Sequence, residues 1–139
     1  MIVVDSGILV AVADADDAHH VTCTGLLDER GHEFVVPAPV VIEVSWILGR
    51  HVSAEVESAF LSSVAEGELI VEDIEDVDYG RMAALVKTYG DLRLGAVDAA
   101  VVAVAERLGI DTVATIDRRD FTVVRPRHVS HFQLVPDLG

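Results

Sequence analysis

The chain has 139 residues, 51% of them hydrophobic, and a mean hydropathy of +0.42, which suffices for a domain with a substantial core. No apolar run approaches the ~18 residues of a membrane span, and no basic stretch precedes the first apolar run, so we expect neither a membrane protein nor a signal peptide. The net charge of −14 excludes nucleic-acid binding through a broad basic surface. A single cysteine, Cys23, rules out an internal disulfide and suits a reducing compartment, so we expect a cytoplasmic protein.

The first part of the chain alternates short apolar runs with amphipathic stretches. The runs at 2–4 and 34–36 predict buried strands. The other stretches show apolar residues at helical spacing, some of them preceded by side chains that can cap a helix. The predicted helices are residues 8–13, a segment that Asp16 or Asp17 caps and that ends near Arg30, residues 39–50, and a segment that Ser53 caps.

The second part continues the alternation. Residues 69–71 and 112–114 predict strands, and 121–124 leads into the last one. A helix begins at Asp76 and is closed by Gly90, and another spans 95–108 and stops at Gly109. The helix at 95–108 is apolar on nearly every side, so we place it in the middle of the molecule. Since strands alternate with helices and we find no linker or repeat, we predict an α/β fold: one domain over residues 1–139 with a mostly parallel sheet flanked by helices on both faces.

Two acidic residues follow predicted strands. Asp5 comes directly after the first strand, and Asp117 follows residues 112–116. Ligands of such sheets bind at the carboxyl ends of the strands, where both acids would lie. An acid in a loop is ordinarily solvated or caps a helix, so neither residue is diagnostic alone.

Two further acids lie in predicted helices and border apolar residues. Glu43 lies beside the apolar stripe of its helix, and Asp98 has Leu94, Val101 and Val102 at the i−4, i+3 and i+4 positions. An ionised carboxylate in such surroundings costs several kcal/mol unless a cation joins it. Arg93 is the one basic residue near Asp98 in the sequence, and helix capping by Asp98 stays open as the alternative.

Four carboxylates at one edge of a sheet would repel one another unless a cation lay among them. Oxygen ligands without a thiolate or a paired histidine select Mg²⁺ or Mn²⁺ over zinc. The histidine pairs offer no competing metal site, because adjacent residues do not share a helix face and the second pair lacks a third ligand. We interpret His19, His20, His128 and His131 as surface residues and Cys23 as a small buried hydrophobe.

The basic residues are concentrated near the fourth acid. Four arginines fall within ten residues, namely Arg118, Arg119, Arg125 and Arg127. Beside a pocket whose charge a metal neutralises, such a cluster could hold a phosphate backbone. A solvated loop is an equally good interpretation.

Four segments resemble the PIN-domain ribonucleases, in particular the VapC-type toxins of bacterial toxin–antitoxin pairs. The matching segments are 3–7, 40–44, 94–103 and 114–121, in family order and at family spacing. The resemblance implies a PIN domain in which Asp5, Glu43, Asp98 and Asp117 form the catalytic acidic quartet. It also implies that Asp5 and Asp98 are the principal Mg²⁺ ligands and that Thr115 is an accessory catalytic group that orients a ligand or water.

The same resemblance implies a function. The implied protein is a Mg²⁺-dependent endoribonuclease that acts on single-stranded or structured RNA. It would be a homodimer and the toxin of a pair whose antitoxin is of the VapB type. The sequence departs from the family at Gly7, since members commonly carry a second Ser or Thr after the first aspartate. Asp120 lies in the same loop as Asp117 and could reach the metal or cap a helix.

Two other functions remain open. A haloacid-dehalogenase-like phosphatase also has an aspartate after its first strand, but it requires Asp-x-Asp, and Gly7 stands at the third position. A catalytically idle PIN-like module that only binds a partner would explain the apolar excess. Four intact acids argue against the idle module, which has no need of them.

Overall fold

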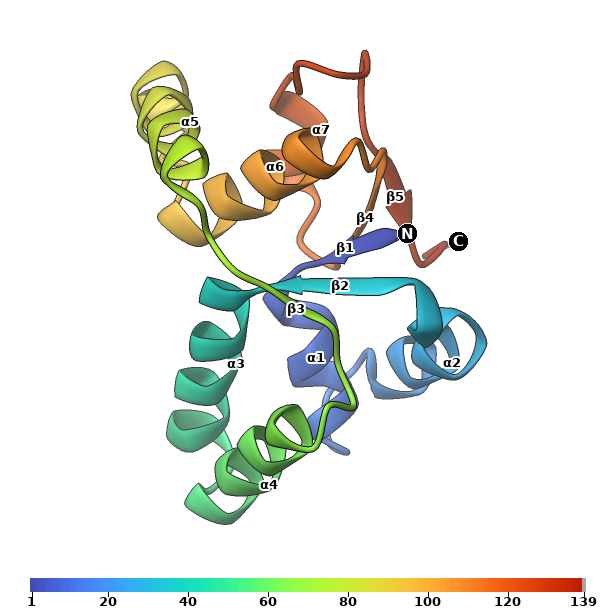
Figure 1. Ribbon diagram of the computed structural model, residues 1–139. Helices are drawn as coiled ribbons and strands as arrows, with labels where there is room; N and C mark the ends of the chain where they lie inside the picture. The colour runs from blue at the N-terminus through green and yellow to red at the C-terminus, as the bar shows by residue number, and fades with distance from the viewer. Residues whose placement is uncertain (139) are drawn as a thin grey trace.

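A five-stranded parallel sheet forms the centre of the computed structural model, which describes residues 1–138 (Figure 1). The strands lie in the order β3-β2-β1-β4-β5, and β1 lies between β2 and β4, with Val3 opposite both Val35 and Val113. All strand pairs are parallel, as the alternation of elements predicted. The strands are β1 (Ile2–Val4), β2 (Phe34–Pro37), β3 (Val71–Glu72), β4 (Thr112–Ala114) and β5 (Gln133–Val135).

Helices cover both faces of this sheet, which confirms the predicted α/β class. The first four helices lie on one face and the last three on the other (Figure 1). Residues 99–105 of α6 are all buried, so this helix is the central one, as its apolar composition predicted. The helices are α1 (Ser6–Ala13), α2 (His20–Arg30), α3 (Ala38–His51), α4 (Ala54–Ala65), α5 (Asp76–Thr88), α6 (Ala96–Leu108) and α7 (Arg119–Val123), with 3₁₀ turns at Gly31–Glu33 and Gly90–Leu92.

Two predicted helix ends are confirmed by their hydrogen bonds and dihedral angles. The Ser53 hydroxyl accepts a hydrogen bond from the Val56 amide at 3.1 Å and caps α4. Gly109 adopts the left-handed conformation, with φ of 68°, and ends α6.

Some boundaries differ from the sequence predictions. The second helix begins at His20, because Asp17 belongs to a turn and its carboxylate accepts from the His19 amide at 2.8 Å. The strand predicted at 69–71 lies at 71–72. Residues 121–123 belong to the short helix α7, and β5 follows only after a loop. Within the described residues, no helix has the length and apolarity needed to cross a membrane.

We expect Gly109→Ala to lower the free energy of unfolding by about 1 kcal/mol, because a Cβ disfavours the left-handed conformation. Gly80 is the matched control: it lies inside α5, and a Cβ there would meet no atom within 4 Å. Gly80→Ala should therefore raise the free energy of unfolding by about 0.5–1 kcal/mol. Urea unfolding of both variants checks this, and effects of the same sign would contradict it.

Candidate active site

Asp5 occupies the carboxyl end of the central strand. Its amide extends the ladder by donating to the Ala114 carbonyl at 2.9 Å, and the residue is only 8% exposed. Its carboxylate is held from two sides, since Oδ1 accepts from the Ser6 amide at 2.8 Å and Oδ2 from the Thr115 hydroxyl at 3.0 Å. Asp5 thereby also begins α1 as its N-cap residue.

Thr115 joins this carboxylate to the end of the neighbouring strand. It is fully buried directly after β4, and its amide donates to the Val135 carbonyl at 2.9 Å. The Thr115 hydroxyl also lies 3.0 Å from the Asp117 backbone carbonyl. One side chain therefore fixes the orientation of Asp5 and the path of the loop that carries Asp117.

Burial, hydrogen bonds and neighbouring charges all act on the pKa of Asp5. Burial raises the pKa of this carboxyl from its usual range to about 6, although the hydrogen bonds from Ser6 and Thr115 lower it. The negative charges of Glu43 and Asp117 raise it further. Three of the predicted acids therefore interact electrostatically at one edge of the sheet.

Asp98, in the first turn of α6, is the fourth predicted acid of the site. Burial raises its pKa to about 7, and Asp5, Asp120 and Glu43 add to the shift. Asp120 also shares a hydrogen bond with Asp98, which stabilises the protonated form. The structure therefore brings Asp5, Glu43, Asp98 and Asp117 together, and adds Asp120, whose reach the sequence left open.

Two polar atoms near these carboxylates are buried without a hydrogen-bond partner in the part of the chain that the structure describes. They are Ser6 Oγ, next to Asp5, and Asp120 Oδ1, which lies 3.6 Å from Arg119 Nε. Buried polar atoms ordinarily find a partner, so these two could accept one more ligand.

The donor set fits a hard divalent cation, because it consists of carboxylate and hydroxyl oxygens and the carboxyls of Asp5 and Asp98 have raised pKa values. Within residues 1–138, however, no three His, Cys, Asp or Glu side chains form a ready-made metal-binding group. Holding a cation would therefore require these carboxylates to move closer together.

The four arginines of the predicted cluster have different contacts. Arg118 Nε donates to the Thr115 carbonyl at 3.1 Å and its terminal nitrogen to the Pro136 carbonyl, so this side chain braces the loop. No local sequence pattern predicted that role. The side chain of Arg119 is 73% exposed, and Arg125 is also exposed. Arg127 lies apart from the predicted acids, in the lining of a pocket beside α5 and α6.

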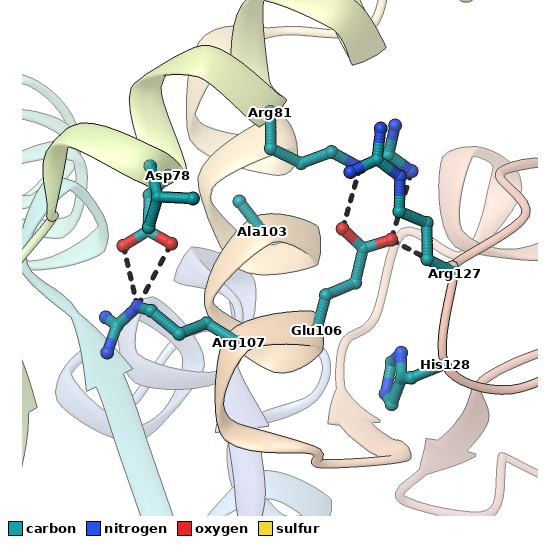
Figure 2. Close-up of a pocket in the computed structure, with 8 residues that line it drawn as sticks. Asp78, Arg81, Ala103, Glu106, Arg107, Arg127 and His128 are labelled. Atoms are coloured by element: carbon teal, nitrogen blue, oxygen red, sulfur yellow. Dashed lines mark hydrogen bonds and ion pairs between the residues drawn. The ribbon is translucent and has the colours of Figure 1, made fainter.

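That pocket, of about 310 Å³, lies against α5 and α6 (Figure 2). Glu106 accepts two hydrogen bonds from Arg81, at 2.7 and 3.0 Å, and one from the Arg127 amide. Arg107 donates to Asp78 at 3.0 Å. None of the predicted catalytic acids lines this pocket, and its charges are largely paired, so we interpret them as structural.

Comparison with known proteins gives a family match and one curated relative. The family described as PIN domain matches residues 2–125. The chain is 30% identical to "Ribonuclease VapC26" of Mycobacterium tuberculosis over 134 residues, which cover 96% of this chain and 99% of the relative.

Similar solved structures share the fold at lower identity. VapC20 of M. tuberculosis, described as a sarcin-ricin loop cleaving toxin, has a TM-score of 0.80 at 20% identity and covers 86% of this chain and 92% of its own. A toxin–antitoxin complex from Klebsiella pneumoniae has a TM-score of 0.68 at 16% identity, with 98% and 97% covered. VapBC2 of Rickettsia felis, bound to a promoter DNA fragment, has a TM-score of 0.67 at 15% identity, with 97% and 98% covered.

We expect the raised pKa of Asp5 to make stability depend on pH. Between about pH 4 and pH 6 the folded state binds a proton that the unfolded state has released, so this carboxyl destabilises the fold increasingly as pH rises. Asp5→Asn should therefore gain stability relative to the wild type on going from pH 4 to pH 7, by about 1–3 kcal/mol.

Urea unfolding in EDTA at several pH values measures this difference. Asp28→Asn, at an exposed position of α2, is the control and should show no such trend. A constant difference between Asp5→Asn and the wild type would contradict the prediction.

Proposed function

Since this chain belongs to the PIN domain family, we propose that it is a Mg²⁺-dependent endoribonuclease and the toxin of a VapBC-type toxin–antitoxin pair, acting in the cytoplasm. The name of the 30% identical relative, a ribonuclease, supports the activity. The toxin–antitoxin complexes among the similar structures support the pairing with an antitoxin.

The convergence of Asp5, Glu43, Asp98 and Asp117 at the carboxyl ends of β1 and β4 carries this proposal. No basic side chain of the described residues forms an ion pair with any of the four, so their negative charge is not balanced from within. A site of this kind favours a cation and, with it, a phosphate.

Asp5 and Asp98 would hold the metal, with Glu43 and Asp117 completing the acidic ring, and Mn²⁺ could replace Mg²⁺. When bound, the metal supplies Lewis acidity: it lowers the pKa of water and stabilises negative charge on the leaving oxygen. Thr115 holds Asp5 Oδ2 in place through its 3.0 Å hydrogen bond.

Glu43 is half-buried on α3 and within electrostatic reach of both Asp5 and Asp98. We assign it the role of general base, which takes a proton from the attacking water. The water oxygen then bonds to phosphorus while the bond from phosphorus to the 3′-oxygen breaks, and the leaving 3′-oxygen takes up a proton from solvent. The products carry a 5′-phosphate and a 3′-hydroxyl.

Charge and apolar surface support the proposed partners. Arg119 and Arg125 are exposed and could contact the RNA backbone, while Arg118 serves the loop. The net charge of −14 favours an antitoxin with a cationic segment. An apolar pocket of about 340 Å³ against α1, α2 and α4, lined in part by Leu9, Leu27 and Phe60, could receive its apolar side chains.

The idle binding module is the second candidate. The exposed apolar residues favour it equally, because any binding protein needs such a surface. Cleavage of RNA that depends on both Mg²⁺ and Asp98 would exclude it.

We expect Asp98→Asn to lower RNA cleavage at least about 100-fold, while the fold survives and gains stability because a repelling charge is removed. The measurements are cleavage of a single-stranded RNA and melting temperature with and without Mg²⁺. Mg²⁺ should raise the melting temperature of the wild type and of the Asp28→Asn control, but raise that of Asp98→Asn much less. Equal Mg²⁺ shifts in all three proteins would argue against a metal at this pocket.

We expect the homodimer to use the exposed apolar face of α3, where Ile42 and Trp46 are 67% and 58% exposed one turn apart. Trp46→Glu should then halve the mass measured by light scattering, because it places a charge in an apolar contact. Val21→Glu, at an 82% exposed position of α2, should leave the mass unchanged. A wild type that is already monomeric at micromolar concentration would contradict the dimer.

A further inference from the structure

Arg93 has a backbone conformation that an arginine rarely adopts. Its dihedral angles, φ 57° and ψ 45°, are left-handed, and it is the one non-glycine residue with positive φ in the described part of the chain. The Cβ atom makes this conformation unfavourable, and glycine or asparagine occupies it more readily. Strained residues of this kind persist where the surrounding structure holds them, and they concentrate at functional sites.

The turn around Arg93 is held from both sides. The Arg93 amide donates to the Gly90 carbonyl at 3.1 Å, which closes the 3₁₀ turn. Leu94, the next residue, is 4% exposed and packs in the core. Before the turn, the Tyr89 hydroxyl accepts a hydrogen bond from the Arg125 amide at 2.9 Å. The contacts of its neighbours therefore determine the conformation of Arg93, while its own side chain is exposed.

The Arg93 guanidinium has no hydrogen bond or ion pair within residues 1–138. By contrast, Arg81 and Arg107 form ion pairs with acids of α6 and α5, and Arg118 binds backbone carbonyls. An exposed, unpaired cation in a chain with a net charge of −14 is available to an anionic ligand.

Arg93 also lies close to Asp98 in the chain, in the turn that leads into α6. It precedes Gly95, the N-cap residue of α6, by two positions. A Cβ on Gly95 would lie 3.8 Å from Asp98 Oδ2, so the chain runs along this carboxylate as it enters the helix. A phosphate bound beside Asp98 would therefore lie within the range of an arginine side chain on this loop.

We propose that Arg93 binds a phosphate of the RNA strand adjacent to the one that is cut, and that its left-handed backbone positions it for this contact. This inference rests on the proposed RNA cleavage. The guanidinium can donate two parallel hydrogen bonds to a phosphate, and its charge offsets the repulsion between the RNA and the acidic pocket. The strain is then the consequence of placing an arginine where the turn favours glycine or asparagine.

The test compares Arg93→Asn, Arg93→Gly and Arg93→Lys in an Asp98→Asn background, which prevents cleavage. Binding of a fluorescent single-stranded RNA oligonucleotide is measured against salt concentration, together with the melting temperature. Arg93→Asn and Arg93→Gly should bind about 5- to 30-fold more weakly, with a salt slope smaller by about 0.7. Their melting temperatures should rise by about 1–4 °C, because the strain is relieved. Arg93→Lys should restore part of the affinity.

Weaker binding combined with higher stability separates this role from a structural one, which would lower both. Lys87→Ala removes an exposed cation from α5 and serves as the control for net charge. If the Arg93 variants bind RNA as tightly as the parent, or lose no more affinity than Lys87→Ala, the inference is wrong. If the folded wild type neither binds nor cleaves this RNA in the presence of Mg²⁺, the proposed function fails, and this inference fails with it.

Discussion

The hydrogen bond from Thr115 to Asp5 joins the ends of two adjacent parallel strands, and the site depends on it. The two residues are 110 positions apart in the chain, and the pairing of β1 with β4 brings them together. Because both are buried, this carboxylate lies where water cannot solvate it fully, and its pKa rises. The sheet therefore does more than support the site, since it holds a carboxylate where burial favours the protonated form despite two hydrogen bonds to the carboxylate.

The distribution of positive charge reinforces this constraint. Arg81 and Arg107 neutralise acids between α5, α6 and the end of β3, and Arg118 braces the loop after β4. Arg93, the cation nearest to Asp98 in sequence, makes no ion pair with it in the part of the chain described. The acids that contact Arg81 and Arg107 are thus neutralised by ion pairs within the chain, whereas the four predicted catalytic acids form no such pairs. This is the charge arrangement expected of a cation-binding site.

Local sequence patterns predicted the features whose physical cause is itself local. The alternation of elements gave the parallel sheet, and Ser53 and Gly109 gave two helix ends. The apolar neighbours of Asp98 predicted an acid with a perturbed environment, and its raised pKa agrees. The start of α2, the helix α7 and the bracing by Arg118 depend on contacts between distant segments, such as the one between Arg118 and Pro136, and no local pattern encodes them. The roles of the four acids in catalysis remain a prediction.

Several unfavourable features accompany the acidic site: carboxylates that repel one another, buried oxygen atoms without partners, and an arginine in a left-handed turn just before the helix that carries Asp98. Each lowers the stability of the free protein. A cation relieves the repulsion, and a phosphate pairs with the arginine, so under the proposed function both ligands bind the folded state selectively and stabilise it. An antitoxin that places a cationic segment over the same site would gain binding energy from the same repulsion. The instability of the free site would then strengthen the binding of metal, substrate and antitoxin alike. Because all three would draw on relief of the same repulsion, their binding would be thermodynamically coupled.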